Sequence, residues 1–478
     1  MGNSISKGFA WTAIDRFSNL FIQFVLGVII ARLITPEEYG VLGILMVFIN
    51  ISQVFIDSGL GSALIYRNKI EDDYLNTSFV FNFCVSVILY LIIFNLSPIV
   101  ESFFTFSHLS DYLRVSSLVL IVNSLIVVPT SLLKIRLNFK SLAITNIVSS
   151  VVSGILGISA AYHGYGVWAL ILQLISKSVS LLFFLYILCH WYPKFYYRKK
   201  VFIELYRYGV NIFSASCLTK FVDEGISFFI GKSLSPYYLG VYTRGSQFSS
   251  LPGSTIGGIS STALFPSLSA IKNDELHFKR VYKGVIEIQA FLCMPLFVWL
   301  ATMAGPLVRL LITSKWIAVV PVIQILCLGK VLMPAANVTE QVLNAKGRSD
   351  LFFRQQLFKL IAKVVFISIC IPFGLIAVVV GESLCTFLIF FITNFYARSV
   401  SDFRIIDQIK LILPYFFCAL ISGGFAYWTT ILVENDFLII LIGSLVFITL
   451  YIFSLVLGCN KATMFRSYLQ WVRTKLSR

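Results

Sequence analysis

Residues 31–43 read ARLITPEEYGVLG, and residues 231–243 read GKSLSPYYLGVYT. At an offset of 200 positions the two segments share matched residues: Pro36 with Pro236, Gly40 with Gly240, Val41 with Val241 and, further on, Ala63 and Leu64 with Ala263 and Leu264. A second pair, LNFK at 137–140 and LNAK at 343–346, repeats at an offset of 206 positions. Two repeated pairs of segments at nearly the same offset indicate an internal duplication.

The composition places the duplicated chain in a membrane. Of its 478 residues, 58% are hydrophobic and only 13% are charged, and its mean hydropathy is +0.87. Soluble domains carry roughly 25% charged residues. Long apolar runs such as SFVFNFCVSVILYLIIFNL (78–96) do not alternate as the strands of a membrane barrel would. The sequence therefore predicts an all-α polytopic membrane protein.

A helix needs about 20 apolar residues to cross a bilayer. On that scale the sequence predicts fourteen transmembrane helices, at 9–33, 39–63, 77–97, 111–133, 141–162, 165–189, 207–231, 238–267, 284–304, 317–342, 352–372, 374–396, 411–432 and 437–458.

The distribution of positive charge tests this count, because Lys and Arg collect in cytoplasmic loops. With the N-terminus inside, 26 Lys and Arg residues fall in internal loops and termini and four in external loops. We therefore expect both termini to be cytoplasmic. The net charge of +16 is spread among the internal loops instead of forming one stripe, so it does not indicate a nucleic-acid partner.

The repeat predicts how the spans are grouped. Six spans separate its two copies, so both copies have the same orientation, as in transporters built from parallel repeats. We expect an N-terminal six-helix lobe at 1–195, a C-terminal six-helix lobe at 196–400 that repeats the first, two additional transmembrane helices at 401–458, and a basic cytoplasmic tail at 459–478. The tail reads as an amphipathic helix on the inner leaflet, or as a solvated tail.

Several segments resemble a known family. Besides ARLITPEEYGVLG, they are FIDSGLGSALI (55–65), YLGVYTRGSQFSSLPGSTIGG (238–258), ALFPSLSAIKND (263–274) and NAKGRSDL (344–351). They are similar to the Wzx-type polysaccharide flippases, in particular the lipopolysaccharide and colanic-acid exporter branch, of the multidrug/oligosaccharidyl-lipid/polysaccharide exporter superfamily. The resemblance covers residues 1 to about 400.

The resemblance implies two six-helix lobes around a central cavity in the bacterial inner membrane. It also implies that the protein is not an enzyme, and that its substrate is an undecaprenyl-pyrophosphate-linked oligosaccharide moved to the outer leaflet by alternating access. A coupling cation, either H⁺ or Na⁺, and other polysaccharide-assembly membrane proteins are the further expected partners, besides membrane lipids.

Ionisable residues within spans cost about 2.5–3.5 kcal/mol each near the bilayer centre, so each requires an explanation. The basic residues at such depths are Arg16, Lys177, Lys220, Arg244 and Lys330. We expect them to line a water-filled cavity and bind the substrate pyrophosphate, with Arg in bidentate contact and Lys as a point charge. Pairing within the membrane, for example between Lys220 and Glu224, is the alternative.

The acidic residues within spans are Asp15, Asp57, Asp223 and Glu224. They are candidates for binding the coupling ion or for pairing with the basic residues. Lys220, Asp223 and Glu224 follow one another at i, i+3 and i+4 and so share one helical face.

Other chemistry is not indicated. The four histidines have no metal-ligand spacing, so we expect no metal, cofactor or catalytic residue. A cation-coupled multidrug or small-molecule antiporter of the same superfamily is the first alternative function. An integral-membrane glycan polymerase or ligase is the second, although such enzymes usually carry a large external loop that this chain lacks.

Overall fold

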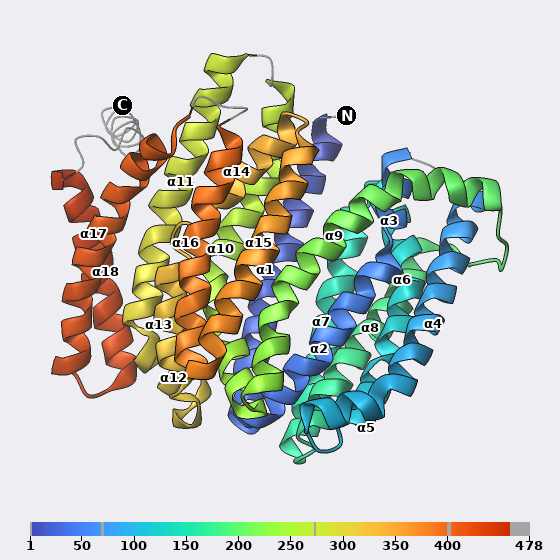
Figure 1. The fold of residues 1–478 in the computed structure, drawn as a ribbon, viewed down its shortest axis with the longest axis horizontal. Coiled ribbons are helices and arrows are strands. Elements are labelled where there is room, and N and C mark those ends of the chain that lie inside the picture. The colour runs from blue at the N-terminus through green and yellow to red at the C-terminus, as the bar shows by residue number, and fades with distance from the viewer. Residues whose placement is uncertain (1, 68–70, 272–273, 399–402, 459–478) are drawn as a thin grey trace. The chain divides into compact units, whose positions relative to one another are not determined.

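The computed structural model describes residues 2–67, 71–271, 274–398 and 403–458, and its regular elements within them are all helical (Figure 1). The α-helices are α1 (Gly2–Leu33), α2 (Pro36–Asp57), α3 (Leu60–Arg67), α4 (Asp72–Phe104), α5 (Leu109–Ser116), α6 (Leu118–Ile135), α7 (Phe139–Tyr162), α8 (Val167–Cys189), α9 (Lys199–Ser233), α10 (Pro236–Ala270), α11 (Glu275–Thr302), α12 (Ala304–Ile312), α13 (Val319–Gly329), α14 (Met333–Ala345), α15 (Ser349–Cys370), α16 (Leu375–Ala397), α17 (Ile405–Leu432) and α18 (Asp436–Gly458).

Among the described residues, eleven helices are long and apolar enough to cross a membrane, and a twelfth span results if α13 and α14 count as one bent element. The chain is thus a multi-pass membrane protein. Two more of the predicted spans correspond to α9 and α10, each 35 residues long. Because α9 carries eight charged residues and α10 is rich in Ser and Gly, the count of fourteen stays a prediction, as does the orientation of the termini.

The chain divides into two compact units, Met1–Gly240 and Val241–Arg478, here called unit 1 and unit 2. The lobe borders predicted near residues 195 and 400 stay predictions, and α9 packs within unit 1 against α2. The predicted cytoplasmic tail, 459–478, lies outside the described residues.

Both copies of the repeat encode a helix start. In the first, the Thr35 hydroxyl accepts a hydrogen bond from the Glu38 backbone N–H, and the Glu38 carboxylate accepts one from Thr35 N at 2.7 Å. This reciprocal cap satisfies backbone donors that the first helical turn leaves open. In the second, the Tyr238 N–H donates to the Ser235 hydroxyl at 3.5 Å. A proline follows each capping residue, and its fixed φ suits the first helical position.

The two copies also pack on each other. A Cβ added at Gly40 would overlap the backbone carbonyl of Pro236, and one added at Gly240 would overlap that of Pro36. The helix starts of α2 and α10 therefore cross with their backbones in contact, each glycine against the proline of the other copy. All four residues belong to unit 1.

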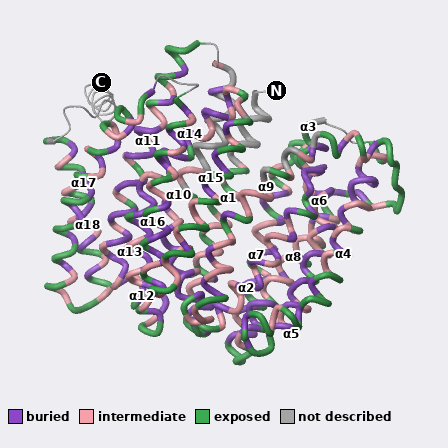
Figure 2. Tube along the Cα trace, viewed as in Figure 1, coloured by how far each residue is buried: buried purple, intermediate pink, exposed green. Residues whose placement is uncertain are grey.

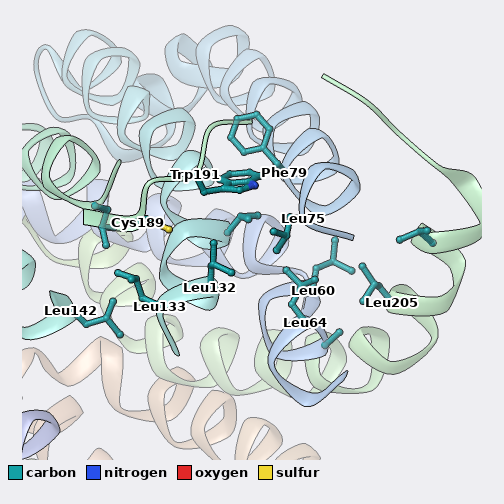
Figure 3. Close-up of a cluster of buried hydrophobic side chains, with 14 residues drawn as sticks. Leu60, Leu64, Leu75, Phe79, Leu132, Leu133, Leu142, Cys189, Trp191 and Leu205 are labelled. Carbon is teal, nitrogen blue, oxygen red and sulfur yellow. The ribbon is translucent and has the colours of Figure 1, made fainter. Parts of the chain in front are cut away.

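A hydrophobic core closes one end of unit 1. Leu60 and Leu64 of α3 pack with Phe79 of α4, Leu132 of α6 and Trp191, which follows α8 (Figure 3). Figure 1 shows α3 at this end of the unit and α5 at the opposite end. The core therefore joins α3, α4, α6, α7, α8 and α9 at this end of the unit.

Unit 2 is built around α11, which contacts α13, α14 and α17. Its largest fully buried side chains include Tyr282, Phe297, Trp316 and Tyr415. The last two helices, α17 and α18, pair with each other, and exposed positions run along both (Figure 2). Arg309 of α12 binds the Asp436 carboxylate at the start of α18 with Nε at 3.0 Å, which fixes this hairpin to the rest of the unit.

Because no Cβ fits at either helix crossing, we expect Gly40→Ala and Gly240→Ala each to lower the free energy of unfolding by about 1–3 kcal/mol or more, the usual cost of overpacking. Gly225→Ala is the control, since a Cβ there meets open space in α9. Thermal unfolding in detergent and abundance in the membrane measure the effect. Unchanged melting of both alanine variants would show that the backbones do not meet in this way.

Candidate functional site

A polar pocket of about 510 Å³ lies inside unit 1, between α2, α3, α6 and α9. Its lining combines charged residues with amides and hydroxyls: Asp57, Lys134, Lys220, Gln53, Asn123, Ser62, Thr130, Ser131 and Ser216. Apolar side chains complete the wall, among them Ile65, Ile126 and Phe213. Such a concave site with a few convergent polar groups is the usual form of a ligand site.

The pocket owes its shape to a break in the chain between α2 and α3. Ser58 and Gly59 both have positive φ, at 39° and 71°, so α2 ends there and α3 starts in a new direction. A Cβ at Gly59 would overlap the backbone of Gly209 in α9. The short helix α3 then turns Leu60 and Leu64 into the hydrophobic core and Ser62 toward the pocket.

The last turns of α2 present a polar face at positions i, i+3 and i+7. The Asn50 amide donates to the Glu224 carboxylate of α9 at 2.9 Å. The Gln53 amide donates to the Asp57 carboxylate at 3.0 Å, and Asn123 of α6 donates to the Gln53 carbonyl at 2.9 Å. These bonds hold the acidic groups in place beside the pocket.

Two ammonium groups reach the pocket from different helices. Lys220 of α9 lies 3.8 Å from the Glu224 carboxylate, and its side chain is 41% exposed. Lys134, at the end of α6, interacts electrostatically with Asp57. The Lys220 pair is longer than a good hydrogen bond, so the amine has room to turn toward an anion. The pocket can therefore bind a negatively charged group and offer amides and hydroxyls to a polar one.

Asp15 and Lys177, also predicted as site residues, lie in a second polar cluster of unit 1. The Asp15 carboxylate accepts hydrogen bonds from Asn19 at 2.7 Å and from Asn146 of α7 at 3.2 Å. Lys177 of α8 interacts with it electrostatically. Arg16, on the next position of α1, is exposed.

Lys330 and Arg244 lie in the interior of unit 2, 7% and 5% exposed. The Lys330 amine, at the break between α13 and α14, donates to the hydroxyls of Ser249 at 2.9 Å and Ser250 at 2.8 Å on α10. A buried ammonium with several acceptors fixes the helices around it.

Arg244 is held in a similar way. Its guanidinium donates to the Gln247 carbonyl at 2.6 Å and lies over the ring of the buried Trp316, 5.9 Å from the centroid. Asp223, the remaining acidic candidate, is exposed on α9. That the five basic residues predicted from the sequence line one cavity stays a prediction.

Sequence reasoning missed two features. Lys134 lies between the predicted spans 111–133 and 141–162 and is not among the predicted site residues, although Asn50, Gln53 and Asp57 on one face of an apolar helix signal a polar site nearby. Lys359 is not among the predicted site residues either, yet it is 8% exposed and pairs with Glu340. Among the described residues, no three His, Cys, Asp or Glu side chains are grouped so as to hold a metal ion.

The fold defines the class of protein. It aligns with the structure of the lipid II flippase MurJ in its inward closed conformation with a TM-score of 0.78 at 17% identity, covering 94% of this chain and 99% of that one. The chain therefore has the fold of this class of membrane transporters.

The particular family follows from the sequence. The profile described as polysaccharide biosynthesis protein matches residues 29–321. The chain belongs to this family. It is 21% identical over 359 residues to the succinoglycan biosynthesis transport protein ExoT of Rhizobium meliloti, covering 75% of this chain and 73% of the relative. It is 22% identical over 391 residues to the lipopolysaccharide biosynthesis protein WzxC of Escherichia coli, covering 79% and 77%.

If the pocket of unit 1 holds water, a cysteine placed in it should react with a small polar thiol reagent. We expect Ser62→Cys, in a background without the native cysteines, to be labelled in membranes by a methanethiosulfonate reagent that carries a sulfonate group. Ser124→Cys is the control, because Ser124 is fully buried between helices. Equal labelling of the two positions, or protection of both, would contradict a water-filled pocket; mass spectrometry of the intact protein gives the readout.

Proposed function

We propose that this protein is a flippase that moves an undecaprenyl-pyrophosphate-linked oligosaccharide across the bacterial inner membrane by alternating access. The observation that carries the proposal is the polar pocket of unit 1, which two ammonium groups line from α6 and α9. A structural role alone does not require so many amides and hydroxyls around open space. Membership of the polysaccharide biosynthesis family supports a glycan as the cargo.

Lys220 and Lys134 are the proposed ligands of the pyrophosphate. Each ammonium offers three donors and a compact charge, which suits a phosphate group that must be released again. Gln53, Asn123 and Thr130 line the same pocket and can hydrogen-bond sugar hydroxyls. We propose Arg16 and Lys177 as further contacts along the path of the substrate, and structural roles for Arg244 and Lys330.

The pair of Lys220 and Glu224 suggests how transport is coupled to a cation. When the pyrophosphate binds the Lys220 ammonium, Glu224 no longer pairs with that lysine. The Glu224 carboxylate is half-buried, where an unpaired charge is unfavourable. A proton then neutralises the carboxylate, while Asn50 continues to donate to it. Binding of substrate and of a proton thereby favour each other. We propose H⁺ as the coupling ion, with Asp57, Asp15 and Asp223 as secondary candidates.

The substrate site is tested by Lys220→Ala and Lys134→Ala. We expect each to lower glycan export about tenfold at unchanged abundance, because a hydrogen bond to a charged group contributes about 1.5–3 kcal/mol. Lipid-linked repeat units should accumulate on the inner leaflet. Lys200→Ala, an exposed lysine outside the pocket, is the control. Lys330→Ala should instead lower abundance and export together.

Export by stable Lys220→Ala and Lys134→Ala variants at the rate of the unchanged protein would overturn the pocket as substrate site. Flipping of a fluorescent undecaprenyl-pyrophosphate oligosaccharide in proteoliposomes tests the function itself. Proteoliposomes that ignore this lipid but extrude a cationic dye would favour a drug antiporter.

Coupling is tested by Glu224→Gln, which keeps the hydrogen bond from Asn50 but cannot take up a proton. We expect this variant to flip substrate at a rate that no longer responds to a pH gradient across the vesicle. Glu275→Gln serves as the control, because Glu275 is exposed in the first turn of α11 and lies outside the pocket of unit 1. A Glu224→Gln variant that still accelerates with the gradient would remove Glu224 from the coupling step.

A further inference from the structure

Unit 2 contains a pocket that the proposed transport step does not use. It has a volume of about 330 Å³ and lies between the first turns of α11 and α17. Three exposed lysines line it, Lys279 and Lys283 from α11 and Lys410 from α17. All three precede the apolar stretches of their helices, so they lie at one level, at the end of the spans.

The two acidic residues of the pocket differ in position and in burial. Glu287 is 3% exposed, and its carboxylate accepts a hydrogen bond from the Tyr415 hydroxyl at 2.9 Å, so it forms part of the floor. Asp407 is exposed among the lysines. The accessible part of the pocket thus carries three positive charges and one negative charge.

The two helices are held apart at a fixed spacing. The Gln408 amide of α17 donates to the Tyr282 hydroxyl of α11 at 2.9 Å, and that hydroxyl is 2.7 Å from the Thr339 hydroxyl of α14. Phe403 packs edge-on against the Tyr282 ring. These contacts and the bond from Tyr415 to Glu287 hold α11 and α17 together around the pocket. The shape of the pocket therefore does not depend on a ligand.

An apolar stripe runs from the pocket along α17. Phe417, Ile421 and Trp428 follow Lys410 at i+7, i+11 and i+18, which returns them to the same face of the helix. They are 54%, 55% and 64% exposed. The lysines place positive charge at the end of the span, and exposed apolar side chains follow along α17. This arrangement matches a molecule with an anionic headgroup and a hydrocarbon tail.

We propose that this pocket binds the headgroup of an anionic phospholipid from the surrounding membrane. The phosphate lies among Lys279, Lys283 and Lys410, and an acyl chain follows the stripe of Phe417 and Ile421. Basic pockets between transmembrane helices are established binding places for anionic headgroups. The volume is at the lower end of the roughly 300–1,000 Å³ of small-molecule pockets, which fits a headgroup. This proposal does not rest on the proposed flippase function.

The test measures thermal unfolding of the purified protein in nanodiscs of phosphatidylcholine with increasing phosphatidylglycerol, without transport substrate. We expect phosphatidylglycerol to stabilise the unchanged protein at a low mole fraction. Each Lys→Gln change at 279, 283 or 410 should raise the half-saturating fraction about fivefold, because each lysine near an anionic surface contributes about 1 kcal/mol. The triple change Lys194→Gln, Lys199→Gln and Lys200→Gln in unit 1 is the control.

Asp407→Asn provides the opposite change. It removes the one exposed negative charge of the pocket, so it should lower the half-saturating fraction of phosphatidylglycerol. Equal responses of the unchanged protein and the Lys279, Lys283, Lys410 triple variant would overturn the proposal. So would stabilisation by undecaprenyl phosphate but not by phosphatidylglycerol, since the pocket would then serve the carrier lipid.

Discussion

Backbone contact between two helix starts is the constraint on which unit 1 depends. The backbone carbonyl of Pro236 lies against Gly40, and that of Pro36 lies against Gly240. A side chain at either glycine would prevent this close approach. The contact explains why the same short motif occurs twice: each copy is the partner of the other. It holds the first residues of α10, up to Gly240, against the start of α2 within unit 1, where α9 also packs on α2. The crossing holds the first turn of α2, and the polar pocket is lined by the last turns of the same helix.

The sequence predicted what single helices can encode. Apolar length predicted spans such as 141–162 and 374–396, and the helices found there are Phe139–Tyr162 and Leu375–Ala397. It did not predict the 46° bend inside the span expected at 317–342, although Gly329 and Pro334 flank the break, because the apolar residues continue through it. The pocket was predicted only in part: the depth of Lys220 marked it as functional, whereas the roles of Lys134 and Gln53 depend on contacts with other helices.

The two units treat buried charge differently. In unit 1, Asp57, Lys134 and Lys220 border open space, and their charges stay available to a ligand. In unit 2, Lys330 and Lys359 are enclosed by serines or by a carboxylate. The surrounding acceptors stabilise the charge, but they also occupy the N–H donors of the ammonium. An ammonium whose donors are all in use has none left for a ligand. Depth in the membrane alone therefore does not separate a binding lysine from a structural one.

The enclosure of Lys330 has a consequence for biogenesis. Ser249 and Ser250 are translated 81 and 80 residues before Lys330, so the hydroxyls that receive its ammonium exist when α13 emerges from the ribosome. Glu340 is in the reverse position, because its partner Lys359 is translated 19 residues after it. An unpaired carboxylate in a nascent span opposes insertion. We therefore expect the hairpin of α14 and α15 to enter the bilayer as a pair, after translation has reached Lys359.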